Sequence, residues 1–366
     1  MKIAQVICSL GSGGAEKFVT DFSCSLAKRK HVVDVVIIDE FSNDLFEKSM
    51  VDNLTNKGVN VFSLGRKPGS GLRGLFVLFR LLRLVRKNNY DLVHSHLELS
   101  HRMTAIARIF TGSLKHCITV HSSDERWGIL TRFFTRGAHI VCCSDSVRSS
   151  NSQLRNNIVI NNGISLISSA SSKVVREIRN ELSVSSSALL VTSVGNLRKP
   201  KNYLFSLDVF SHLSQMHVNR DLHFVICGDG DEYTHIKEKA NIFGLSNRVH
   251  LLGARSDVPL ILSASDIFLS TSVIEGLPIS VLEAFSVGVP CVLSPIPAHL
   301  EISKDVDGCF IPTLLSAESY AREISKALNM GYEKSSLREE RLGMLNQYDA
   351  DSCCDNYLSF FEKVLV

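Results

Sequence analysis

Residues Ile267 to Leu293 read IFLSTSVIEGLPISVLEAFSVGVPCVL and contain the segments that decide the fold. The apolar run that opens this stretch predicts a buried strand, Ile267 to Leu269. A helix is predicted next, because Pro278 suits the first helical position and apolar residues then follow helical spacing until Gly288. Cys291 to Leu293 predicts a second strand, so we expect an α/β protein.

The start of this helix is a candidate anion site. Unpaired backbone N–H groups and the positive end of the helix dipole suit a phosphate. Two carboxylates stand eight residues apart, Glu275 just before the helix and Glu283 one turn inside it. Because carboxylates repel phosphate oxygens, we expect them to accept hydrogen bonds from hydroxyls, and a sugar nucleotide offers both groups. The alternative is a solvated loop glutamate and a helix-face glutamate that bind nothing.

Length and composition bound the class of protein. A chain of 366 residues is expected to form two domains, and 45% hydrophobic with 21% charged residues is typical of a soluble globular protein. The net charge of +3 is too small to indicate nucleic acid. No run approaches the about 18 apolar residues of a membrane span, and glycines after the first strand interrupt any signal-peptide core. We therefore expect a cytoplasmic protein.

The cysteine and aspartate patterns argue against a metal site. The ten cysteines include no C-x2-C pair and lie mostly in apolar strand runs, so we expect them to be buried and reduced. Three D-x-D triplets, which begin at Asp229, Asp305 and Asp349, match a short metal-binding pattern, but none lies in the context that this pattern needs. We predict no essential metal.

The chain opens with a strand, Ile3 to Cys8, followed by a glycine-rich turn with Gly13 and Gly14 and a helix that ends near Lys28. This order predicts a doubly wound sheet with an anion site at the turn. The turn is not G-x-G-x-x-G and no Walker lysine follows it, which disfavours a nicotinamide site and a P-loop. The alternative is a tight turn without a ligand.

Histidines mark the ends of two further strands. The strand His116 to Val120 delivers His121 to the carboxyl end of the sheet, where doubly wound proteins bind their ligands. His94 and His96, at the end of the strand after Tyr90, are weaker candidates. The alternative for each is a structural histidine of the core.

A cationic turn follows the strand Leu189 to Val194. Arg198, Lys199 and Lys201 place three cations within four residues, which suits a diphosphate. The alternative is a solvated turn.

The segment Gly74 to Lys87 predicts a basic helix with a broad apolar face. Such a helix can lie on an anionic membrane surface, and the alternative is an ordinary helix that packs on the sheet. The expected apolar face consists of Leu75, Leu78, Phe79, Leu82 and Val85, and the cations in and before the helix are Arg66, Lys67, Arg73, Arg80, Arg83, Arg86 and Lys87.

The chain resembles the retaining glycosyltransferases of family 4, which have the GT-B fold. Glu275-Gly276-Leu277-Pro278 with Glu283 matches their E-x7-E signature, and the flanking strands match as well. The resemblance covers nearly the whole chain and is densest between Gly195 and Ile311. The clearest departure is Asn196, which stands where the family usually has an arginine, and this puts one phosphate contact in doubt.

The resemblance implies two doubly wound, Rossmann-like domains that face each other across a cleft. The expected domains are 1–170, on the acceptor side, and 171–350, which binds the nucleotide sugar. The last helix, about 351–366, is expected to pack back on the first domain.

The resemblance also implies roles for residues. Catalytic roles fall to Glu275, beside the donor sugar, and to His121, which contacts that sugar. Donor-binding roles fall to Gly13, Gly14, Lys201, Arg198, Gly276, Leu277 and Glu283, the last of which holds the ribose hydroxyls.

The implied function is transfer of a sugar, with retention of configuration, from a nucleotide sugar to a glycan acceptor. The donor expected is a UDP-sugar, with no cofactor and no metal. The acceptor expected is a glycan on a polyprenyl diphosphate or another lipid carrier in lipopolysaccharide, O-antigen or capsule synthesis, at the inner face of the cytoplasmic membrane. The alternatives are a small soluble acceptor, such as a sugar phosphate or inositol, and an inactive GT-B module that only binds. The sequence does not indicate an oligomeric state.

Overall fold

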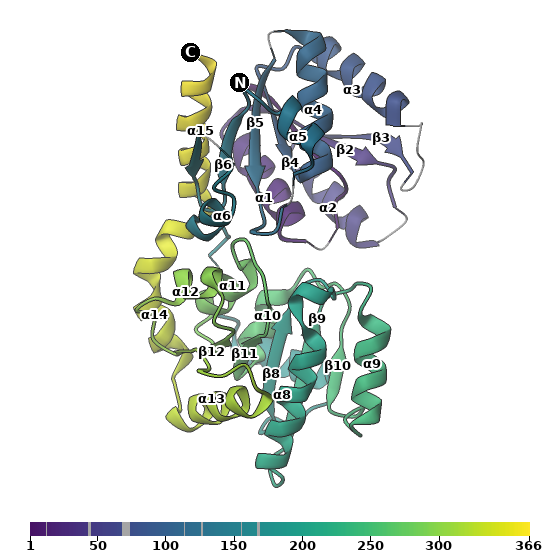
Figure 1. The fold of residues 1–366 in the computed structure, drawn as a ribbon. Coiled ribbons are helices and arrows are strands. Elements are labelled where there is room, and N and C mark those ends of the chain that lie inside the picture. The colour runs from purple at the N-terminus through teal and green to yellow at the C-terminus, as the bar shows by residue number, and fades with distance from the viewer. Residues whose placement is uncertain are drawn as a thin grey trace. The chain divides into compact units, whose positions relative to one another are not determined.

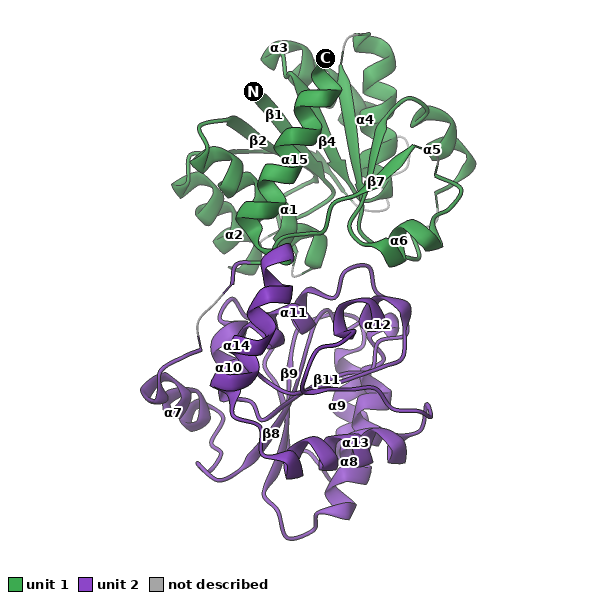
Figure 2. Ribbon diagram, turned by 90° about the vertical axis from the view of Figure 1, so that its left-hand side faces the viewer, with its two compact units in different colours: residues 1–164, 348–366 green, residues 165–347 purple. Residues whose placement is uncertain are grey.

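The computed structural model describes residues 1–11, 13–42, 45–67, 74–112, 114–125, 127–154, 156–166 and 169–366. Its chain divides into two compact units, which Figure 2 colours separately. Unit 1 contains Met1–Ile164 and Tyr348–Val366, and unit 2 contains Ser165–Gln347.

Unit 1 is built on a seven-stranded parallel sheet with the strand order β3-β2-β1-β4-β5-β6-β7. Near-continuous apolar runs form these strands, as expected for a parallel sheet that helices cover on both faces. The strands are β1 (Lys2–Ile7), β2 (Val32–Asp39), β3 (Asn60–Arg66), β4 (Leu92–His96), β5 (Lys115–Val120), β6 (His139–Cys142) and β7 (Asn157–Val159).

Helices cover both faces of this sheet (Figure 1). One face packs against α1 and the C-terminal α15, and the other packs against α3 and α4. The helices of unit 1 are α1 (Gly14–Lys28), α2 (Leu45–Asn56), α3 (Gly74–Asn88), α4 (Glu98–Thr111), α5 (Ile129–Phe134), α6 (Asp145–Ser150) and α15 (Ala350–Leu365).

Helix α15 joins unit 1 through both backbone and side-chain contacts. The Ile164 N–H donates to the carbonyl oxygen of Tyr348 at 2.7 Å, and the Ala350 N–H donates to that of Ile164 at 3.0 Å. The rings of Phe22 and Tyr357 then lie 4.8 Å apart between α1 and α15. The end of the chain therefore completes the core on that face.

Unit 2 has a six-stranded parallel sheet with the order β10-β9-β8-β11-β12-β13. Helices α8, α9 and α13 share one core with this sheet, and α7 and α10 share another. The strands are β8 (Leu189–Val194), β9 (Leu222–Cys227), β10 (Val249–Leu251), β11 (Ile267–Ser270), β12 (Cys291–Leu293) and β13 (Cys309–Phe310). The helices are α7 (Ser172–Glu181), α8 (Tyr203–Met216), α9 (Tyr233–Ile242), α10 (Val258–Ala264), α11 (Ile279–Ser286), α12 (Pro297–Ser303), α13 (Ala317–Met330) and α14 (Lys334–Leu345).

The two sheets confirm the predicted α/β class with two doubly wound domains, and the predicted strand–helix–strand appears as β11, α11 and β12. The placement of Pro278 was wrong by one position. Its ψ of 81° is not helical, so it caps α11 instead of opening it, and its carbonyl oxygen accepts from the Val281 N–H at 3.0 Å.

The predicted apolar face of α3 was also wrong in part. The helix turns Val77, Leu81 and Val85 toward the sheet, because these residues lie four apart on one stripe and pack with the inner residues of β1 and β2. Leu75 and Phe79, two residues of the expected apolar face, are exposed and do not pack on the sheet. Apolar side chains therefore remain on the outer side of this helix.

Close backbone contact between two loops of unit 2 requires glycine. The Gly195 N–H donates to the carbonyl oxygen of Cys227 at 2.9 Å, which brings the loops after β8 and β9 together. Gly228 has a φ of +153°, and a Cβ there would overlap the carbonyl oxygen of Gly195. Substitution at Gly228 would therefore push apart the loops that follow β8 and β9.

Gly228→Ala is expected to lower the free energy of unfolding more than Gly244→Ala does. Gly244, with a φ of +67°, lies in the left-handed region, where alanine costs about 1–2 kcal/mol, and alanine at Gly228, with a φ of +153°, costs about 1–3 kcal/mol of backbone strain. Only Gly228 adds a steric overlap, because nothing lies within 4 Å of a Cβ at Gly244. Urea unfolding of the two variants measures the difference. Equal losses would contradict the claim that the loops are in obligatory contact.

Candidate active site

A salt bridge between Lys201 and Glu275 forms the centre of the candidate site in unit 2. The Lys201 Nζ lies 2.6 Å from a carboxylate oxygen of Glu275, and the side chains are only 25% and 11% exposed. Glu275 lies between β11 and α11, and Lys201 ends a short 3-10 helix, Lys199–Lys201, after β8. Because β8 and β11 are parallel neighbours, their carboxyl-end loops meet at one edge of the sheet.

Neighbouring residues hold the Lys201 side chain in place. A Cβ on Gly195 would lie 3.1 Å from Lys201 Cε, so glycine leaves the space that this side chain occupies. The Tyr203 hydroxyl donates to the carbonyl oxygen of Gly195 at 2.8 Å. Thr271 Oγ1 lies 3.0 Å from the carbonyl oxygen of Asn202, which ties the loop after β11 to the loop after β8.

Lys201 determines the charge state of Glu275. Burial alone would raise the pKa of Glu275, but the attraction and hydrogen bond of Lys201 outweigh it, with smaller contributions from His299 and Ser272, and the pKa is lowered. Burial lowers the pKa of His299 to about 4, against an opposing effect of Glu275. Near neutral pH the site therefore contains a carboxylate, an ammonium and a neutral imidazole.

The other predicted donor residues of unit 2 are close to Lys201 or Glu275 in the sequence. Glu283 is inside α11 and only 5% exposed. Gly276 and Leu277 are buried in the segment that leads into α11. Arg198 is exposed and caps the 3-10 helix that carries Lys201. The structure thus joins Lys201 to Glu275 directly and keeps Arg198 at the surface of the same loop.

The predicted residues of unit 1 lie at the carboxyl edge of its own sheet. His121 directly follows β5, and its ring nitrogens lie 2.9 Å from His96 Nδ1 and 3.2 Å from Asn162 Nδ2. Burial lowers the pKa of His121 to about 4, although the nearby Glu125 carboxylate raises it. His94, a weaker candidate, is buried and bonds Thr119 at 2.7 Å.

The two glycines of the first turn begin α1. Gly13 is the cap residue of α1 and Gly14 its first residue, with Glu16 in the first turn. A Cβ on Gly13 would meet the Glu16 carboxylate, the movable end of a flexible side chain, so the packing does not require glycine there. The donor-binding role of Gly13 and Gly14 stays a prediction.

Several residues in these two groups were missed by sequence reasoning. Ser272 and His299 influence Glu275 in unit 2, and Gln5, Glu125 and Asn162 surround the histidines of unit 1. Only Asn162 carried a signal, because it belongs to the turn sequence Asn161-Asn162-Gly163.

Acidic and sulfur side chains do not gather into a metal site in the described ranges. Within these ranges, no group of three or more His, Cys, Asp or Glu residues is arranged to hold a metal ion. All ten cysteines are free thiols. Metal independence remains a prediction.

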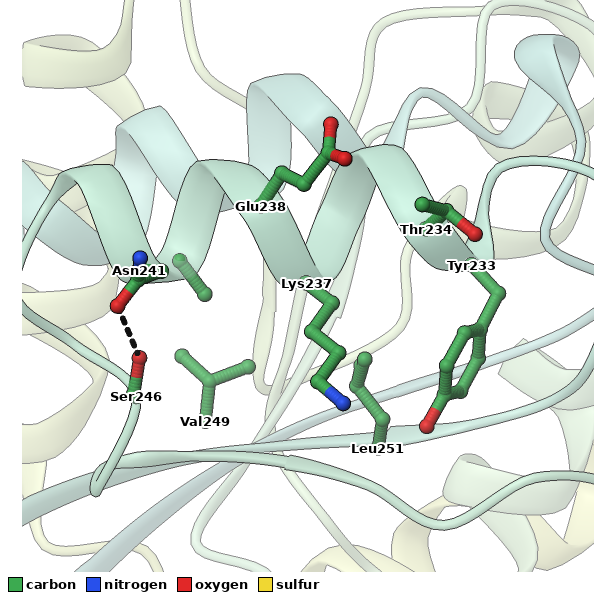
Figure 3. A pocket seen from close by; sticks show the side chains of 9 residues that line it. Tyr233, Thr234, Lys237, Glu238, Asn241, Ser246, Val249 and Leu251 are labelled. Carbon is green, nitrogen blue, oxygen red and sulfur yellow. Dashed lines mark hydrogen bonds between the residues drawn. The ribbon is translucent and has the colours of Figure 1, made fainter.

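Unit 2 also contains a pocket of about 550 Å³ between α9 and β10. Figure 3 shows Lys237 and Tyr233 projecting from α9 toward Val249 and Leu251 of β10. None of the predicted donor residues lines this pocket.

Two family models together match most of the chain. The model described as Glycosyl transferases group 1 matches residues 174–341, and the one described as Glycosyltransferase Family 4 matches residues 12–166. Each match therefore falls almost entirely within one of the two units.

Individual proteins give a consistent comparison. A UDP-Gal:α-D-GlcNAc-diphosphoundecaprenol α-1,3-galactosyltransferase of Escherichia coli is 28% identical over 66% of this chain and 67% of its own length. An N-acetyl-α-D-glucosaminyl L-malate synthase of Bacillus anthracis is 22% identical over 82% of this chain and 81% of its own. A crystal structure of Anabaena HepE in complex with UDP-glucose has a TM-score of 0.84 and 19% identity, with 99% of this chain and 100% of that chain covered, and shows the same fold.

Lys201→Met is expected to lower the free energy of unfolding by about 1.5–3 kcal/mol, because it leaves the buried Glu275 carboxylate without its ammonium partner. The double variant Lys201→Met/Glu275→Gln should lose less than the sum of the single losses. Lys199→Met, an exposed lysine of the same 3-10 helix, is the control and should have little effect.

The contribution of Glu275 to the free energy of unfolding should change with pH in one direction. Folding lowers the pKa of Glu275, so its stabilising effect is present above its ordinary pKa of 4.5 and is lost as the pH falls through the folded value. Urea unfolding of wild type and Glu275→Gln at a series of pH values measures this. A difference that grows as the pH falls would contradict the assigned pairing.

Proposed function

The chain belongs to the family 4 glycosyltransferases of the GT-B fold, also described as glycosyl transferases group 1, and from this premise we propose its substrates. It is a glycosyltransferase of the EC 2.4 type. We propose that it moves a sugar, with retention of configuration, from a UDP-sugar to a glycan on a polyprenyl diphosphate. The observation that carries the donor proposal is the half-buried salt bridge between Lys201 and Glu275, just before α11.

In this proposal, the Lys201 ammonium, which Glu275 holds in place, is available to bind the donor diphosphate. Lys201 is restrained near the start of α11, whose N–H groups and dipole also favour an anion. A diphosphate that takes over Lys201 would leave Glu275 to accept a hydrogen bond from a sugar hydroxyl. In this proposal, Arg198 adds a second cation from the surface of the loop, and Glu283 accepts hydrogen bonds from the ribose hydroxyls.

Bond cleavage in this proposal depends on stabilising the leaving diphosphate. Negative charge grows on the phosphate oxygens as the glycosidic bond breaks, and Lys201 with the backbone N–H groups at Gly276 and Leu277 would stabilise it. The incoming hydroxyl then attacks from the face that the diphosphate leaves, and its proton passes to an oxygen of the departing diphosphate, so the configuration is retained. No cofactor or metal is needed, because these groups already balance the diphosphate charge.

The acceptor proposal rests on the chemistry of the relatives. The E. coli relative is described as acting on a diphosphoundecaprenol-linked sugar, which supports a lipid-linked glycan in lipopolysaccharide, O-antigen or capsule synthesis. The second candidate is a small soluble acceptor, because the B. anthracis relative is described as an L-malate synthase. An inactive module is less well supported, since Lys201, Glu275 and Glu283 are all present.

The outer helices of unit 1 support docking on a membrane. Helices α3 and α4 are in contact, as are α4 and α5, so they form one continuous surface over the sheet (Figure 1). Phe76 on α3 is 73% exposed and Ile129 on α5 is 87% exposed. We call this surface the apolar–basic face and define it by its exposed apolar residues, Leu75, Phe76, Phe79, Ile109, Phe110, Ile129, Leu130 and Phe133.

Helix α3 of this surface also carries exposed cations. Arg80, Arg83, Arg86 and Lys87 are exposed on α3, whereas Arg73, counted with them in the sequence, lies outside the described residues. Each cation near an anionic leaflet is worth about 1 kcal/mol, so a few of them with the exposed rings can hold a protein at a membrane reversibly. Over the described residues, no helix has the length and apolarity to cross a bilayer. We propose peripheral binding at the inner face of the cytoplasmic membrane, where lipid-linked acceptors reside.

The first functional test separates the two glutamates. Glu283→Ala should chiefly raise the donor KM, because the ribose hydroxyls lose a charged acceptor. A loss of about 1.5–3 kcal/mol of donor binding corresponds to a roughly 10- to 150-fold higher KM. Glu275→Ala should instead depress kcat, because it lies beside the reacting sugar. Nucleotide release from UDP-sugars, with membrane extract as acceptor, measures both.

Glu238→Ala, an exposed carboxylate of α9, is the control and should behave as wild type. Activity should persist in EDTA. Wild-type kinetics of both glutamate variants would contradict the donor assignment, and loss of activity in EDTA that manganese restores would contradict metal independence.

The second functional test concerns the membrane. The protein should sediment with liposomes that contain anionic lipid, and Arg83→Glu/Lys87→Glu should abolish this binding. Lys48→Glu/Lys57→Glu changes the net charge equally on or beside α2, away from the apolar–basic face, and should leave binding intact. Sedimentation that is independent of anionic lipid, or lost equally in both double variants, would contradict the proposal.

A further inference from the structure

The loop that carries Glu275 is attached to the rest of unit 2 on two sides. On one side, the Val273 N–H donates to the carbonyl oxygen of Pro200, in the 3-10 helix after β8, at 2.9 Å. On the other side, the Ser294 hydroxyl, just after β12, donates to the carbonyl oxygen of Ser272. The segment that leads from β11 to Glu275 is therefore held between the 3-10 helix and the end of β12.

His299 of α12 strengthens the attachment to β12. Its Nδ1 lies 3.0 Å from the carbonyl oxygen of Ser294 and 3.1 Å from Ser294 Oγ. Because a carbonyl oxygen only accepts, Nδ1 carries the hydrogen, and in a neutral imidazole Nε2 is then an acceptor. This Nε2 lies 3.4 Å from Ser270 Oγ, at the end of β11. The buried His299 side chain thus joins the ends of β11 and β12.

The hydrogens of the two serines on either side of Thr271 can be assigned from their acceptors. The Ser272 side chain is hydrogen-bonded to the Glu275 carboxylate, which only accepts, so the Ser272 hydroxyl is the donor. Ser270 Oγ lies 3.3 Å from Ser272 Oγ and can donate its one hydrogen to His299 Nε2. Each of the two hydroxyls therefore has its own acceptor, and the Ser272 hydrogen stays on Glu275.

The charges around Glu275 show why this hydroxyl matters. The titratable groups that act on this carboxylate are Lys201, His299 and Tyr203. Burial lowers the pKa of His299 to about 4, and burial, with a further effect of Glu275, raises the pKa of Tyr203 well above its usual value. Near neutral pH both are uncharged, and Lys201 is the charged partner. When Lys201 moves to a diphosphate, the buried carboxylate depends on hydrogen bonds, and Ser272 supplies one.

We propose that Ser272 and His299 are positioning residues that keep the Glu275 carboxylate ionised and in place while Lys201 is bound to the diphosphate. This inference rests on the proposed function, in which Glu275 accepts a hydrogen bond from a sugar hydroxyl. Ser272 acts directly, as a donor to the carboxylate. His299 acts through the loop, because it holds Ser270 and Ser294 on the two strands that flank it. All of these residues belong to unit 2.

The first test changes the hydroxyl. With UDP-glucose, UDP-galactose and UDP-N-acetylglucosamine as donors and membrane extract as acceptor, Ser272→Ala should lower kcat by about tenfold or more and change the donor KM little. Loss of a hydrogen bond to the charged form raises the pKa of Glu275, so kcat should begin to fall at a higher pH than in wild type. Ser272→Thr keeps the hydroxyl and should retain most of the activity. Ser325→Ala, on α13, is the control and should behave as wild type.

The second test changes the imidazole. His299→Ala should also lower kcat, and His299→Asn should recover part of the loss, because its NH2 group can donate to the Ser294 carbonyl oxygen. His217, whose Nε2 lies 2.8 Å from Ser325 Oγ, provides the control, and His217→Ala should lower the Tm without changing kcat. The kcat loss of Ser272→Ala/His299→Ala should be smaller than the product of the single losses, since both act through Glu275. A His299→Ala variant that loses only stability, or losses that multiply, would overturn the role of His299.

A measurement without a donor separates this inference from the proposed function. The carbon-13 chemical shift of the Glu275 carboxylate, followed against pH in the ligand-free protein, gives its pKa. Lys201→Met removes the ammonium, and in that background Ser272→Ala should raise the pKa of Glu275 further, whereas Ser272→Thr should not. A pKa that Ser272→Ala leaves unchanged would overturn the inference, whether or not a sugar is transferred. A raised pKa together with no turnover of any UDP-sugar by wild type would instead count against the proposed function.

Discussion

The salt bridge between Lys201 and Glu275 is the interaction on which the unit 2 site depends. The Glu275 side chain is only 11% exposed, and its charge would be costly without a partner, whereas Lys201 is 25% exposed. The surrounding sequence serves this pair: Gly195 leaves space for the lysine, Gly228 lets two loops meet, and Thr271 ties the loop after β11 to the loop after β8. A ligand that brings its own anion can replace the glutamate without leaving a charge unpaired, which suits a reversible diphosphate site.

In unit 1, polar side chains at the carboxyl edge of the sheet also hold one another, but through hydrogen bonds between neutral groups instead of a salt bridge. His96 and His121 are held by hydrogen bonds that run along the edge of the sheet, and α1 and α15 pack against the same face. Helix α15 comes from the end of the chain, and its Tyr357 hydroxyl lies 2.8 Å from Thr119 Oγ1. Thr119 Oγ1 also lies 2.7 Å from His94 Nε2. The C-terminal helix therefore supports the histidines at the carboxyl edge of the unit 1 sheet.

Sequence reasoning predicted the features that repeat or that depend on near neighbours. The strand–helix–strand around Glu275 and Glu283 follows from local apolar patterns and turn residues, and the two doubly wound domains were implied by the resemblance to the family. The residues of α3 that pack on the sheet were predicted only in part. This helix has apolar residues on more than one side, so its sequence alone does not show which side faces the sheet. His299 and Gln5 were missed for a different reason. Their partners are distant in the sequence, and no local pattern marks a buried polar contact that only the folded sheet creates.

A crystal structure with a bound UDP-sugar tests the account of the donor site most directly. The account predicts that the nucleotide binds at the start of α11, with Lys201 Nζ within hydrogen-bond distance of a diphosphate oxygen and no longer paired with Glu275. It also predicts a sugar hydroxyl on the Glu275 carboxylate and the ribose hydroxyls on Glu283. A nucleotide bound elsewhere, or a diphosphate bound while Lys201 remains on Glu275, would contradict it.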